Sequence, residues 1–431
     1  MPLEMMTTAR PIRLLVITML YEPDCVGIAA IASDMCNALA ARGHHLTVYT
    51  TYPYYPEWRT KRNVNVWKIE REVANNVQIH RHGLFIPHRP TRLLARILHE
   101  LSFPLSLMRS LFRREQFDGV MVFCPLLGSV VFAVTRKLLR REPLWVNIQD
   151  LPAEAGLASG INKFRSLHRL IAFAQRSLFR RGEVWSSISP EMVDQLQPLR
   201  GKNNSLHLLP NWLVGPLQRH VRQMPSKVGR PPHRPPRLVY CGTIGNKQGL
   251  LTFCQKMKDF SHFDFRFEIF GDGSEAPDVR RWLEQEGDDR IRMGGLLPDD
   301  QFIRKIHDAD WFVICEKQGA GSSFLPSKLI PCVSVGTPVL AISDRTSPLG
   351  REMAAHDLGI AMQWEQLFSL ADRMADVQDD LASYRAFQEN CLRRGEAFGR
   401  DAAMDRIEQV LGEMCGGMSP ASHRVQERCR A

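Results

Sequence analysis

The stretch Leu238-Val-Tyr-Cys-Gly-Thr-Ile-Gly-Asn-Lys-Gln-Gly-Leu250 decides the fold of this chain. Its apolar run ends at Gly242 and predicts a buried strand, and the turn that follows has three glycines in eight positions. Helical spacing of the next apolar residues predicts a one-faced helix: Leu250, Phe253, Cys254 and Met257. A strand, a glycine-rich turn and a helix in this order suit a phosphate, because the turn's N–H groups are accessible and the helix N-terminus is partly positive.

Lys247 lies within this turn, where its ammonium group can reach the same anion. Glycine turns also join many strands to helices without binding anything. A solvated surface lysine on a plain connection is therefore the alternative interpretation.

Length and composition limit the classes of protein to consider. A chain of 431 residues is too long for one hydrophobic core and predicts two domains. The net charge of +10 favours anionic partners such as phosphates, nucleic acid or acidic lipid. No zinc-finger spacing or RNA-binding signature accompanies the charge, so we expect no nucleic acid partner. The ten cysteines form no C-x-x-C pair, which indicates a reducing compartment.

The first ten residues lack the apolar core of a signal peptide. No run approaches the roughly 20 apolar residues of a membrane-spanning helix. We therefore expect a cytoplasmic protein, with attachment to a membrane face as a further possibility.

The first half of the chain predicts a doubly wound domain. Strands at Arg13–Thr18 and His45–Thr50 flank a one-faced helix that starts after Gly27, and ligands of such folds bind at the carboxyl ends of the strands. Gly27 therefore lies at the ligand-binding edge of this domain, or it simply starts the helix. Further apolar runs predict more strands: Gly119–Cys124, Leu144–Ile148, Val184–Ser189 and Leu206–Leu209.

Asp150 follows the strand Leu144–Ile148 almost directly. A carboxylate at this end of a parallel strand points towards the ligand side of the domain. Asp150 is therefore a candidate site residue, and a helix cap or turn residue is the alternative.

The segment Pro90–Glu115 combines many large apolar side chains with five arginines. Pro104 is predicted to divide it into two helical pieces. A basic, apolar helix of this kind can lie in a membrane interface and meet anionic lipid. The alternative is an ordinary helix packed on the sheet with a solvated basic edge.

The second half repeats the alternation of strands and helices. Residues Met224–Pro236 contain five prolines and are predicted to be a linker or an exposed loop. The strand Phe265–Phe270 then ends in Gly271-Asp-Gly273, a turn that can approach a ligand closely. Further strands are predicted at Ile291–Gly295, Trp311–Cys315 and Pro338–Ile342. This half is therefore expected to be a second doubly wound domain.

Seven more motifs occur in an order that is known from one enzyme family. They are Tyr52-Pro-Tyr-Tyr-Pro-Glu-Trp58, Asn147-Ile-Gln-Asp150, Ser187-Ile-Ser189, Pro210-Asn-Trp212, Phe270-Gly-Asp-Gly273, Pro326-Ser-Lys-Leu329 and Gly336-Thr-Pro-Val339. With the glycine turn, they resemble the retaining nucleotide-sugar glycosyltransferases of family 4. The likeness is greatest to the branch with colanic-acid-type fucosyltransferases and N-acetylfucosamine transferases of bacterial surface polysaccharides.

The resemblance implies the GT-B fold, an α/β architecture in which two doubly wound Rossmann-like domains face each other across a cleft. Residues 1–215 would form the acceptor-side domain, completed by a closing helix at about 398–415. Residues 216–397 would bind the nucleotide sugar, and residues 416–431 would be a disordered tail.

The resemblance also implies site residues. Lys247 and Lys328 would stabilise the leaving diphosphate, and Asp150 would lie beside the reacting sugar and acceptor. Donor-binding residues would be Gly242, Thr243, Gly245, Gly271, Gly273, Lys317, Pro326 and Ser327, with Gly27 in an acceptor or phosphate loop. Relatives usually work without a metal, so no metal or other cofactor is expected, and no enzyme nucleophile is assigned.

One departure concerns the acidic pair Glu-x7-Glu of many family members. Glu316 is followed eight positions later by Phe324, so the pair is missing here. The polysaccharide branch has the loop Pro326-Ser-Lys328 instead, which this chain shares.

The sequence thus predicts a transferase that moves a sugar, fucose-like in the branch it resembles, from a nucleotide diphosphate. The transfer would retain configuration, and the acceptor would be lipid-linked or a polysaccharide precursor. The enzyme would sit peripherally on the inner face of the plasma membrane and meet anionic lipid there. Two rivals remain: a nucleotide-sugar 2-epimerase of the same architecture and a non-catalytic partner in polysaccharide assembly.

Overall fold

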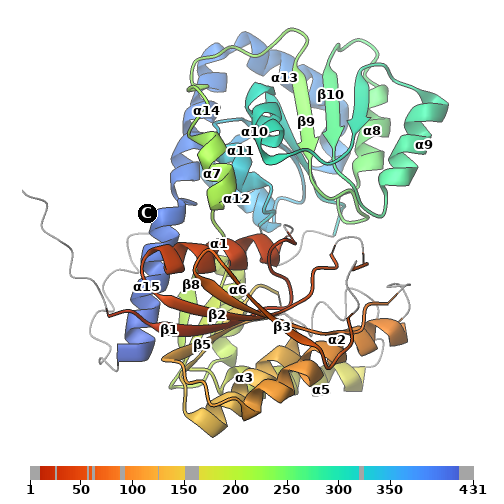
Figure 1. Ribbon diagram of the computed structural model, residues 1–431. Coiled ribbons are helices and arrows are strands. Elements are labelled where there is room, and N and C mark those ends of the chain that lie inside the picture. The colour runs from red at the N-terminus through yellow and green to blue at the C-terminus, as the bar shows by residue number, and fades with distance from the viewer. Residues whose placement is uncertain are drawn as a thin grey trace, which may run out of the picture. The chain divides into compact units, whose positions relative to one another are not determined.

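The computed structural model describes residues 10–24, 27–55, 58–60, 64–87, 93–124, 126–150, 165–319 and 325–416. The chain divides into two compact units (Figure 1). Unit 1 comprises Met1–Pro210 with Ala403–Ala431, and unit 2 comprises Asn211–Ala402. Each unit is an α/β layer structure around its own sheet, so the predicted fold class is confirmed.

Unit 1 contains, within its described residues, an eight-stranded sheet of order β3-β4-β2-β1-β5-β6-β7-β8. The strands are β1 (Arg13–Ile17), β2 (His45–Thr51), β3 (Ile69–Ala74), β4 (Val77–His82), β5 (Gly119–Cys124), β6 (Leu144–Ile148), β7 (Val184–Ser187) and β8 (Ser205–Leu208). All neighbours are parallel except β3, which runs antiparallel to β4. The central strands β5 and β6 are entirely buried, as their unbroken apolar runs predict.

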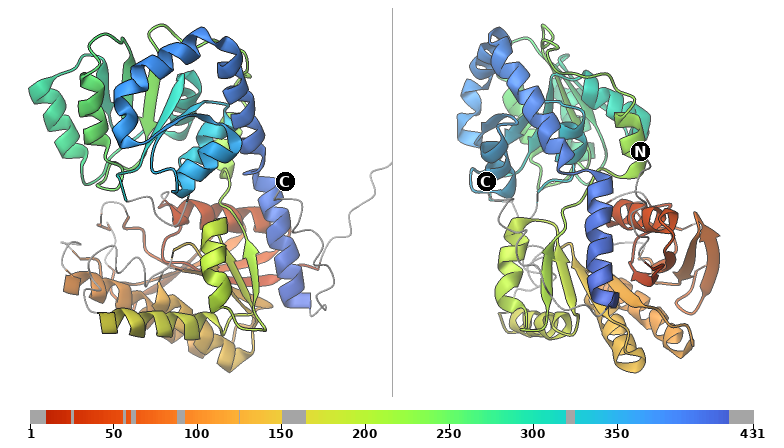
Figure 2. Two further views of the ribbon diagram at one scale, coloured as in Figure 1. Left: turned by 180° about the vertical axis from the view of Figure 1, so that it is seen from behind. Right: turned by 90° about the vertical axis from the view of Figure 1, so that its left-hand side faces the viewer.

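The helices of unit 1 cover both faces of this sheet. They are α1 (Ile28–Ala41), α2 (Leu93–Met108), η1 (Arg109–Phe112), α3 (Leu127–Arg140), α5 (Arg165–Phe179), α6 (Pro190–Leu196), η2 (Gln197–Leu199) and α15 (Arg400–Gly416). Helices α2, α3 and α5 lie side by side along one face, with α1 on the other (Figures 1 and 2). None of the described helices is long and apolar enough to cross a bilayer.

The hairpin β3–β4 was not predicted. Strand β3 is Ile-Glu-Arg-Glu-Val-Ala, which has three consecutive charged residues at its centre and no fully buried position. Such an edge strand lacks the apolar run by which the central strands are recognised.

Pro104 does not divide its segment, contrary to the prediction. Helix α2 runs from Leu93 to Met108 with Pro104 inside it. A Cβ atom built on Gly128, at the start of α3, would lie 2.2 Å from the Pro104 ring. The proline ring therefore occupies space that a glycine of the neighbouring helix leaves open, and this packing favours the continuous helix.

Helix α15 is tied to the C-terminal end of α1. Arg42 forms ion pairs with Asp405 at 2.7 Å and Glu408 at 2.5 Å, and His44 Nε2 lies 3.0 Å from the Glu408 carboxylate. Residues from Ala403 onwards consequently cluster with unit 1. The tail predicted after Gly416 lies outside the described residues.

Unit 2 has a six-stranded, fully parallel sheet in the described residues, of order β11-β10-β9-β12-β13-β14. The strands are β9 (Arg237–Cys241), β10 (Arg266–Phe270), β11 (Ile291–Gly294), β12 (Trp311–Cys315), β13 (Val339–Ile342) and β14 (Gly359–Met362). The helices are α7 (Gly215–Val221), α8 (Leu250–Lys258), α9 (Ala276–Glu286), α10 (Asp299–Asp308), α11 (Leu329–Ser334), α12 (Pro348–His356), η3 (Trp364–Ser369), α13 (Leu370–Asp379) and α14 (Leu381–Glu396). One apolar core lies on each face of the sheet.

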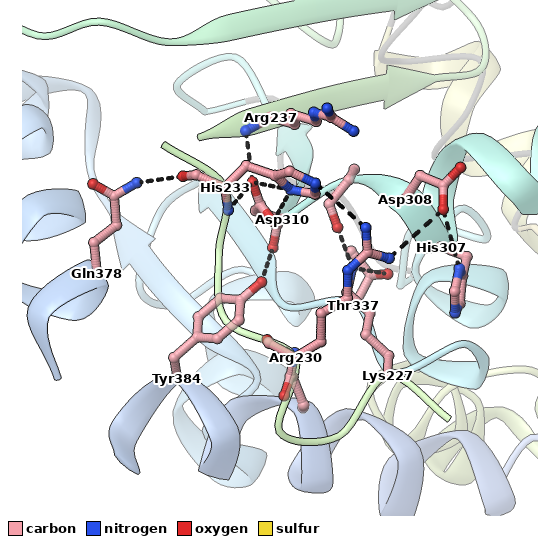
Figure 3. Close-up of polar contacts among 12 residues, drawn as sticks. Lys227, Arg230, His233, Arg237, His307, Asp308, Asp310, Thr337, Gln378 and Tyr384 are labelled. Carbon is pink, nitrogen blue, oxygen red and sulfur yellow. Dashed lines mark hydrogen bonds and ion pairs between the residues drawn. The ribbon is translucent and has the colours of Figure 1, made fainter. Parts of the chain in front are cut away.

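Residues Met224–Pro236 lie within unit 2 and do not link the two units, so the linker interpretation was wrong; they form a loop that is exposed only in part. They form a strap across unit 2 that is held by buried polar contacts (Figure 3). The Lys227 ammonium is almost completely buried and donates to Ala309 O and, at 3.1 Å, to Thr337 Oγ1. Composition alone suggested solvent exposure because prolines and cations rarely fill a core, but here the buried cation has partners.

Asp310 forms the centre of this network (Figure 3). Its carboxylate accepts from His233 Nδ1 at 2.9 Å and from the backbone N–H of Arg237 at 2.8 Å, while its carbonyl accepts from Tyr384 at 3.0 Å. The strap is thereby fixed to β9, β12 and α14 at the end of the sheet opposite the glycine turns.

Candidate active site

The glycine turns after β9 and β10 touch each other at the carboxyl edge of the unit 2 sheet. A Cβ atom built on Gly271 would lie 1.9 Å from Gly242 O, and Gly271 has a φ of +155°. Gly242 N donates to Phe270 O at 2.9 Å, and Ile244 N donates to Asp272 O at 2.9 Å. The two turns therefore form one backbone ledge that only glycine at position 271 permits.

This ledge lies beside the point where the strand order reverses. Strands β10 and β9 continue to one side and β12 and β13 to the other, and ligands of doubly wound sheets bind in the crevice at such a point. Lys317, directly after β12, is hydrogen-bonded to the glycine turn that follows β9. Its N–H donates to Lys247 O at 2.8 Å, and its Nζ donates to Asn246 Oδ1 at 3.0 Å.

Lys328 lies under the first glycine turn. Its Nζ donates to the Tyr240 hydroxyl at 2.8 Å and lies 4.2 Å from the centre of the Tyr240 ring. Tyr240 in turn donates to Thr243 O in the turn itself. Burial lowers the pKa of Lys328 to about 8, against the opposing influence of Cys315, Cys241 and Glu316. The result is an ammonium group held beside the turn by Tyr240.

Lys247 is in the opposite situation. It is exposed, and in the described part of the chain its ammonium group has no hydrogen-bond or ion-pair partner. Gly245 N, nearby in the same turn, is satisfied by Gln248 Oε1 at 3.0 Å. Lys247 is therefore an exposed surface cation next to a structured backbone ledge.

The loop that contains Lys328 also contains Pro326 and Ser327. Ser327 is exposed, and Pro326 O accepts from Leu329 N at 3.0 Å to open helix α11. The preceding residues 320–324, which include Phe324 of the acidic-pair comparison, lie outside the described residues.

Glu316 is a partly buried carboxylate at the end of β12. It accepts from Ser347 Oγ at 3.0 Å, and its carbonyl accepts from Trp364 Nε1 at 2.8 Å. Burial raises the pKa of Glu316, and nearby Asp344 raises it further. Asp344 itself accepts from Gly319 N at 3.0 Å.

Sequence reasoning missed Tyr240, Asp344, Ser347 and Trp364 as site residues. Asp344 and Ser347 follow strand β13, at the same edge as the other loops. Their position after a buried parallel strand is the same signal that identified Asp150, so they could have been found. Trp364 gave no such signal.

The two candidates in unit 1 lie at the carboxyl edge of its own sheet. Asp150 follows β6. The pKa of the Cys124 thiol, at the end of β5, is raised chiefly by burial and further by the nearby Asp150 carboxylate. Gly27 precedes α1 with a φ of +59°, and a Cβ atom built on it would meet nothing within 4 Å. Both positions suit ligand contact within unit 1, and they belong to a different unit from the glycine ledge.

Residues 26–212 match the family model described as a glycosyl transferase 4-like domain. WcaI of Escherichia coli K12, assigned as a glycosyl transferase of colanic acid biosynthesis, is 26% identical over 348 residues, which is 79% of this chain and 85% of WcaI. Residues 26–212 thus match a glycosyl transferase 4-like domain, and the chain is similar to a family 4 glycosyltransferase over most of its length.

Solved structures agree with the fold of this glycosyltransferase. Sucrose-phosphate synthase from Thermosynechococcus elongatus superposes with a TM-score of 0.66 at 15% identity, over 94% of this chain and 99% of that one. HepE from Anabaena, solved with UDP-glucose, gives a TM-score of 0.61 at 11% identity over 93% of this chain and 100% of its own. The predicted GT-B fold and the predicted likeness to colanic-acid-type enzymes are thus confirmed.

Proposed function

We propose that this glycosyltransferase moves a hexose from a nucleoside-diphosphate sugar onto a lipid-linked saccharide of a bacterial surface polysaccharide, with retention at C1. Unit 2 binds the donor and unit 1 the acceptor. In the reaction the bond between C1 and the diphosphate oxygen breaks, and the acceptor oxygen bonds to C1. The acceptor hydroxyl loses its proton, and the nucleoside diphosphate leaves.

The observation that carries this proposal is the cation beside the glycine ledge. Developing negative charge on a leaving diphosphate is stabilised most by donors and cations that are already in place. Lys328 is held against the turn by Tyr240, and the ledge formed by Gly242 and Gly271 leaves backbone exposed to a ligand. Lys247, exposed on the same turn, adds a second cation that can contact the diphosphate.

Contacts to the donor sugar are proposed for Glu316 and the loop after β13. Glu316 and Asp344 are acidic side chains on neighbouring strand ends, and Ser347 fixes the first of them. They offer hydrogen-bond acceptors to sugar hydroxyls without the Glu-x7-Glu spacing. The narrower proposal of a fucose-like sugar rests on the resemblance to the colanic-acid branch. No metal or other cofactor is part of the proposed mechanism.

Lipid-linked acceptor and peripheral membrane binding are proposed from the surface of unit 1. Large apolar side chains are exposed on neighbouring helices: Leu94, Leu98, Leu101 and Leu105 on α2, Phe112 on η1, Leu138 and Leu139 on α3, and Phe173 on α5. Exposed arginines accompany them, including Arg114 and Arg141. Apolar insertion together with attraction to acidic headgroups is the pattern of a membrane-interface helix. We therefore place the enzyme on the cytoplasmic face of the plasma membrane.

A binding screen with UDP-, GDP- and dTDP-sugars tests the donor part of this proposal. Isothermal calorimetry on the wild-type chain and on Lys328→Ala should show one nucleotide class that binds the wild type and binds the variant at least tenfold more weakly. Equal affinity in the two proteins would remove the Lys328 loop from the donor site. Absence of binding for all three classes would contradict the proposed function.

A further inference from the structure

Unit 1 contains an aromatic cluster that the donor site does not use. Tyr54, Tyr55 and Trp58 belong to the motif after β2 and pack around His99 of α2. The Trp58 ring centre lies 5.1 Å from that of His99, 5.6 Å from Tyr54 and 6.2 Å from Tyr55. The rings of Tyr54, Tyr55, Trp58 and His99 thus form one compact group near the carboxyl end of β2.

The inner half of this cluster is rigid. Tyr54 is 4% exposed and His99 is 2% exposed. His99 Nδ1 lies 2.6 Å from Phe85 O and so carries the proton, which leaves Nε2 to accept from the Tyr54 hydroxyl at 3.1 Å. Both ring nitrogens of His99 are therefore occupied in holding the cluster together, and neither is available for acid–base chemistry.

The outer half is partly open to solvent. Tyr55 and Trp58 keep part of their surface exposed, although both rings have aromatic neighbours with which to pack. Trp58 also has a φ of +53°, a left-handed conformation that is unusual for a bulky residue. A strained backbone of this kind persists where the surroundings hold it, and it occurs often at ligand-binding sites.

The position of the cluster suggests its ligand. Ligands of doubly wound domains bind at the carboxyl ends of the strands, and β2 ends three residues before Tyr54. On the other side, His99 is flanked on α2 by the exposed Leu98 and Leu101. The cluster therefore connects the ligand edge of unit 1 with the apolar helix that we propose to meet the membrane.

We propose that Tyr55 and Trp58 form a stacking platform for the pyranose ring of the lipid-linked acceptor. This inference rests on the proposed function. The negative face of an aromatic ring attracts the weakly positive C–H groups on one face of a sugar ring. An acceptor whose lipid enters along α2 would present its sugar to these two rings.

Ligand-detected saturation-transfer NMR with n-octyl β-D-glucopyranoside, below its micelle concentration, tests the platform. This probe carries a pyranose on an alkyl chain, and the two parts give separate proton signals. Wild-type protein should saturate the sugar-ring protons, and Trp58→Leu and Tyr55→Leu should each reduce that saturation at least threefold. Trp58→Phe should retain most of it, which shows that an aromatic face and not mere bulk is needed.

Trp67→Leu is the matched control, because Trp67 is 57% exposed in the same unit and lies outside the cluster. It should leave the sugar signals unchanged. Equal sugar saturation in the wild type and Trp58→Leu, or no sugar saturation in the wild type, would overturn the platform. So would a loss of vesicle binding in Trp58→Leu with intact sugar signals, since the ring would then be a membrane anchor.

The donor-binding screen distinguishes failure of the stacking platform from failure of the proposed function. If the wild type binds a nucleotide sugar and Trp58→Leu does so equally well but loses the sugar-ring signal, both proposals stand. If donor binding is present and the sugar-ring signal survives in Trp58→Leu, the platform alone fails. If no nucleotide sugar binds, the proposed function and the platform fail together.

Discussion

Two lysines in contrasting environments carry the proposed chemistry at the scale of single residues. Lys328 is enclosed between the Tyr240 ring and the glycine turn, whereas Lys247 is exposed and has no side-chain partner among the described residues. A cation held in place stabilises charge at one position, and an exposed cation in the same turn is available to contact the diphosphate from the solvent side. The two lysines therefore need different tests.

Replacing Lys247 with alanine is predicted to lower kcat by about 30- to 1,000-fold, because one contact to developing charge contributes about 2–4 kcal/mol to the transition state. Stability should be unchanged, since the side chain is exposed and makes no described contact. Steady-state kinetics with thermal unfolding checks both parts. Lys256→Ala, an exposed lysine on the adjoining α8, is the control and should behave as wild type. Turnover of Lys247→Ala within about threefold of wild type would remove Lys247 from the mechanism.

The lowered pKa of Lys328 predicts that kcat/KM for the donor depends on pH. Its pKa is lowered to about 8 by burial, so the free enzyme loses the cation as the pH rises above that value. The value of kcat/KM for the donor should fall about tenfold per pH unit above pH 8, with little change below it. Lys328→Arg, which stays charged, should have a flat profile over pH 7–10 even if its activity is lower. A wild-type profile that is flat to pH 10 would show that the ammonium form of Lys328 is not required.

The lysines could be predicted from sequence, but the groups that position them could not. Lys247 and Lys328 are cations in loops with recognisable composition. Tyr240 is 88 residues away from Lys328 along the chain and looks like any other buried strand residue. Its role depends on the pairing of two loops, and pairing at that distance leaves no local pattern.

At the scale of helices and strands, apolar periodicity predicted the elements that are buried on both faces. Strands β5, β6 and β9 are examples, because a short unbroken apolar run between turn residues is typical of a strand in the middle of a parallel sheet. The errors concern elements whose stability comes from tertiary contacts. The half-exposed strand β3, the continuous helix α2 and the strap at Met224–Pro236 are all held by packing or by buried partners.

The strap predicts a pH-dependent stability. Burial lowers the pKa of Lys227 from 10.5 to about 8, so between these values the unfolded chain binds more protons and folding stability rises with pH. Between pH 8 and pH 10 the free energy of unfolding of the wild type should gain about 2 kcal/mol relative to Lys227→Met. Denaturant titrations of both proteins at the two pH values provide the measurement. Parallel pH dependence in the two proteins would mean that Lys227 is not buried as a titrating group.

The exposed apolar and basic side chains on α2 and the neighbouring helices predict that the protein binds anionic vesicles. Arg114 and Arg141 are exposed and without a described partner, whereas Arg113 is partly buried against His80 and so is a poor choice for substitution. Replacing Arg114 and Arg141 with glutamine should weaken binding to phosphatidylglycerol vesicles roughly 30-fold at low salt, at about 1 kcal/mol per arginine. High salt should remove this difference between the proteins.

The apolar part of the same surface is tested by Leu98→Gln with Leu101→Gln. These two changes should weaken vesicle binding at low and at high salt, because insertion of apolar side chains is not screened. Leu296→Gln, an equally exposed leucine in unit 2, is the control and should bind as wild type. Equal binding of the wild type to neutral and anionic vesicles, or to neither, would contradict the membrane assignment.

At the scale of the whole molecule, the chain combines two doubly wound units that carry different candidate binding features. Unit 2 has the glycine ledge and the partly buried Lys328, and unit 1 has the aromatic cluster and the helices with exposed apolar and basic side chains. In the proposed transfer, unit 2 would bind the soluble donor and unit 1 would bind the membrane-bound acceptor. An epimerase would need no acceptor surface, so evidence for acceptor binding by unit 1 would favour the proposed transferase.

The release of nucleoside diphosphate from the preferred sugar nucleotide, with and without bacterial membrane lipid extract, tests the central claim most directly. We predict release by the wild type only when the extract supplies an acceptor, at a rate unaffected by EDTA and lost in Lys328→Ala. Conversion of the sugar nucleotide to an isomer without nucleotide release would indicate an epimerase instead. Failure to consume the sugar nucleotide in the presence of acceptor lipid would contradict catalysis altogether.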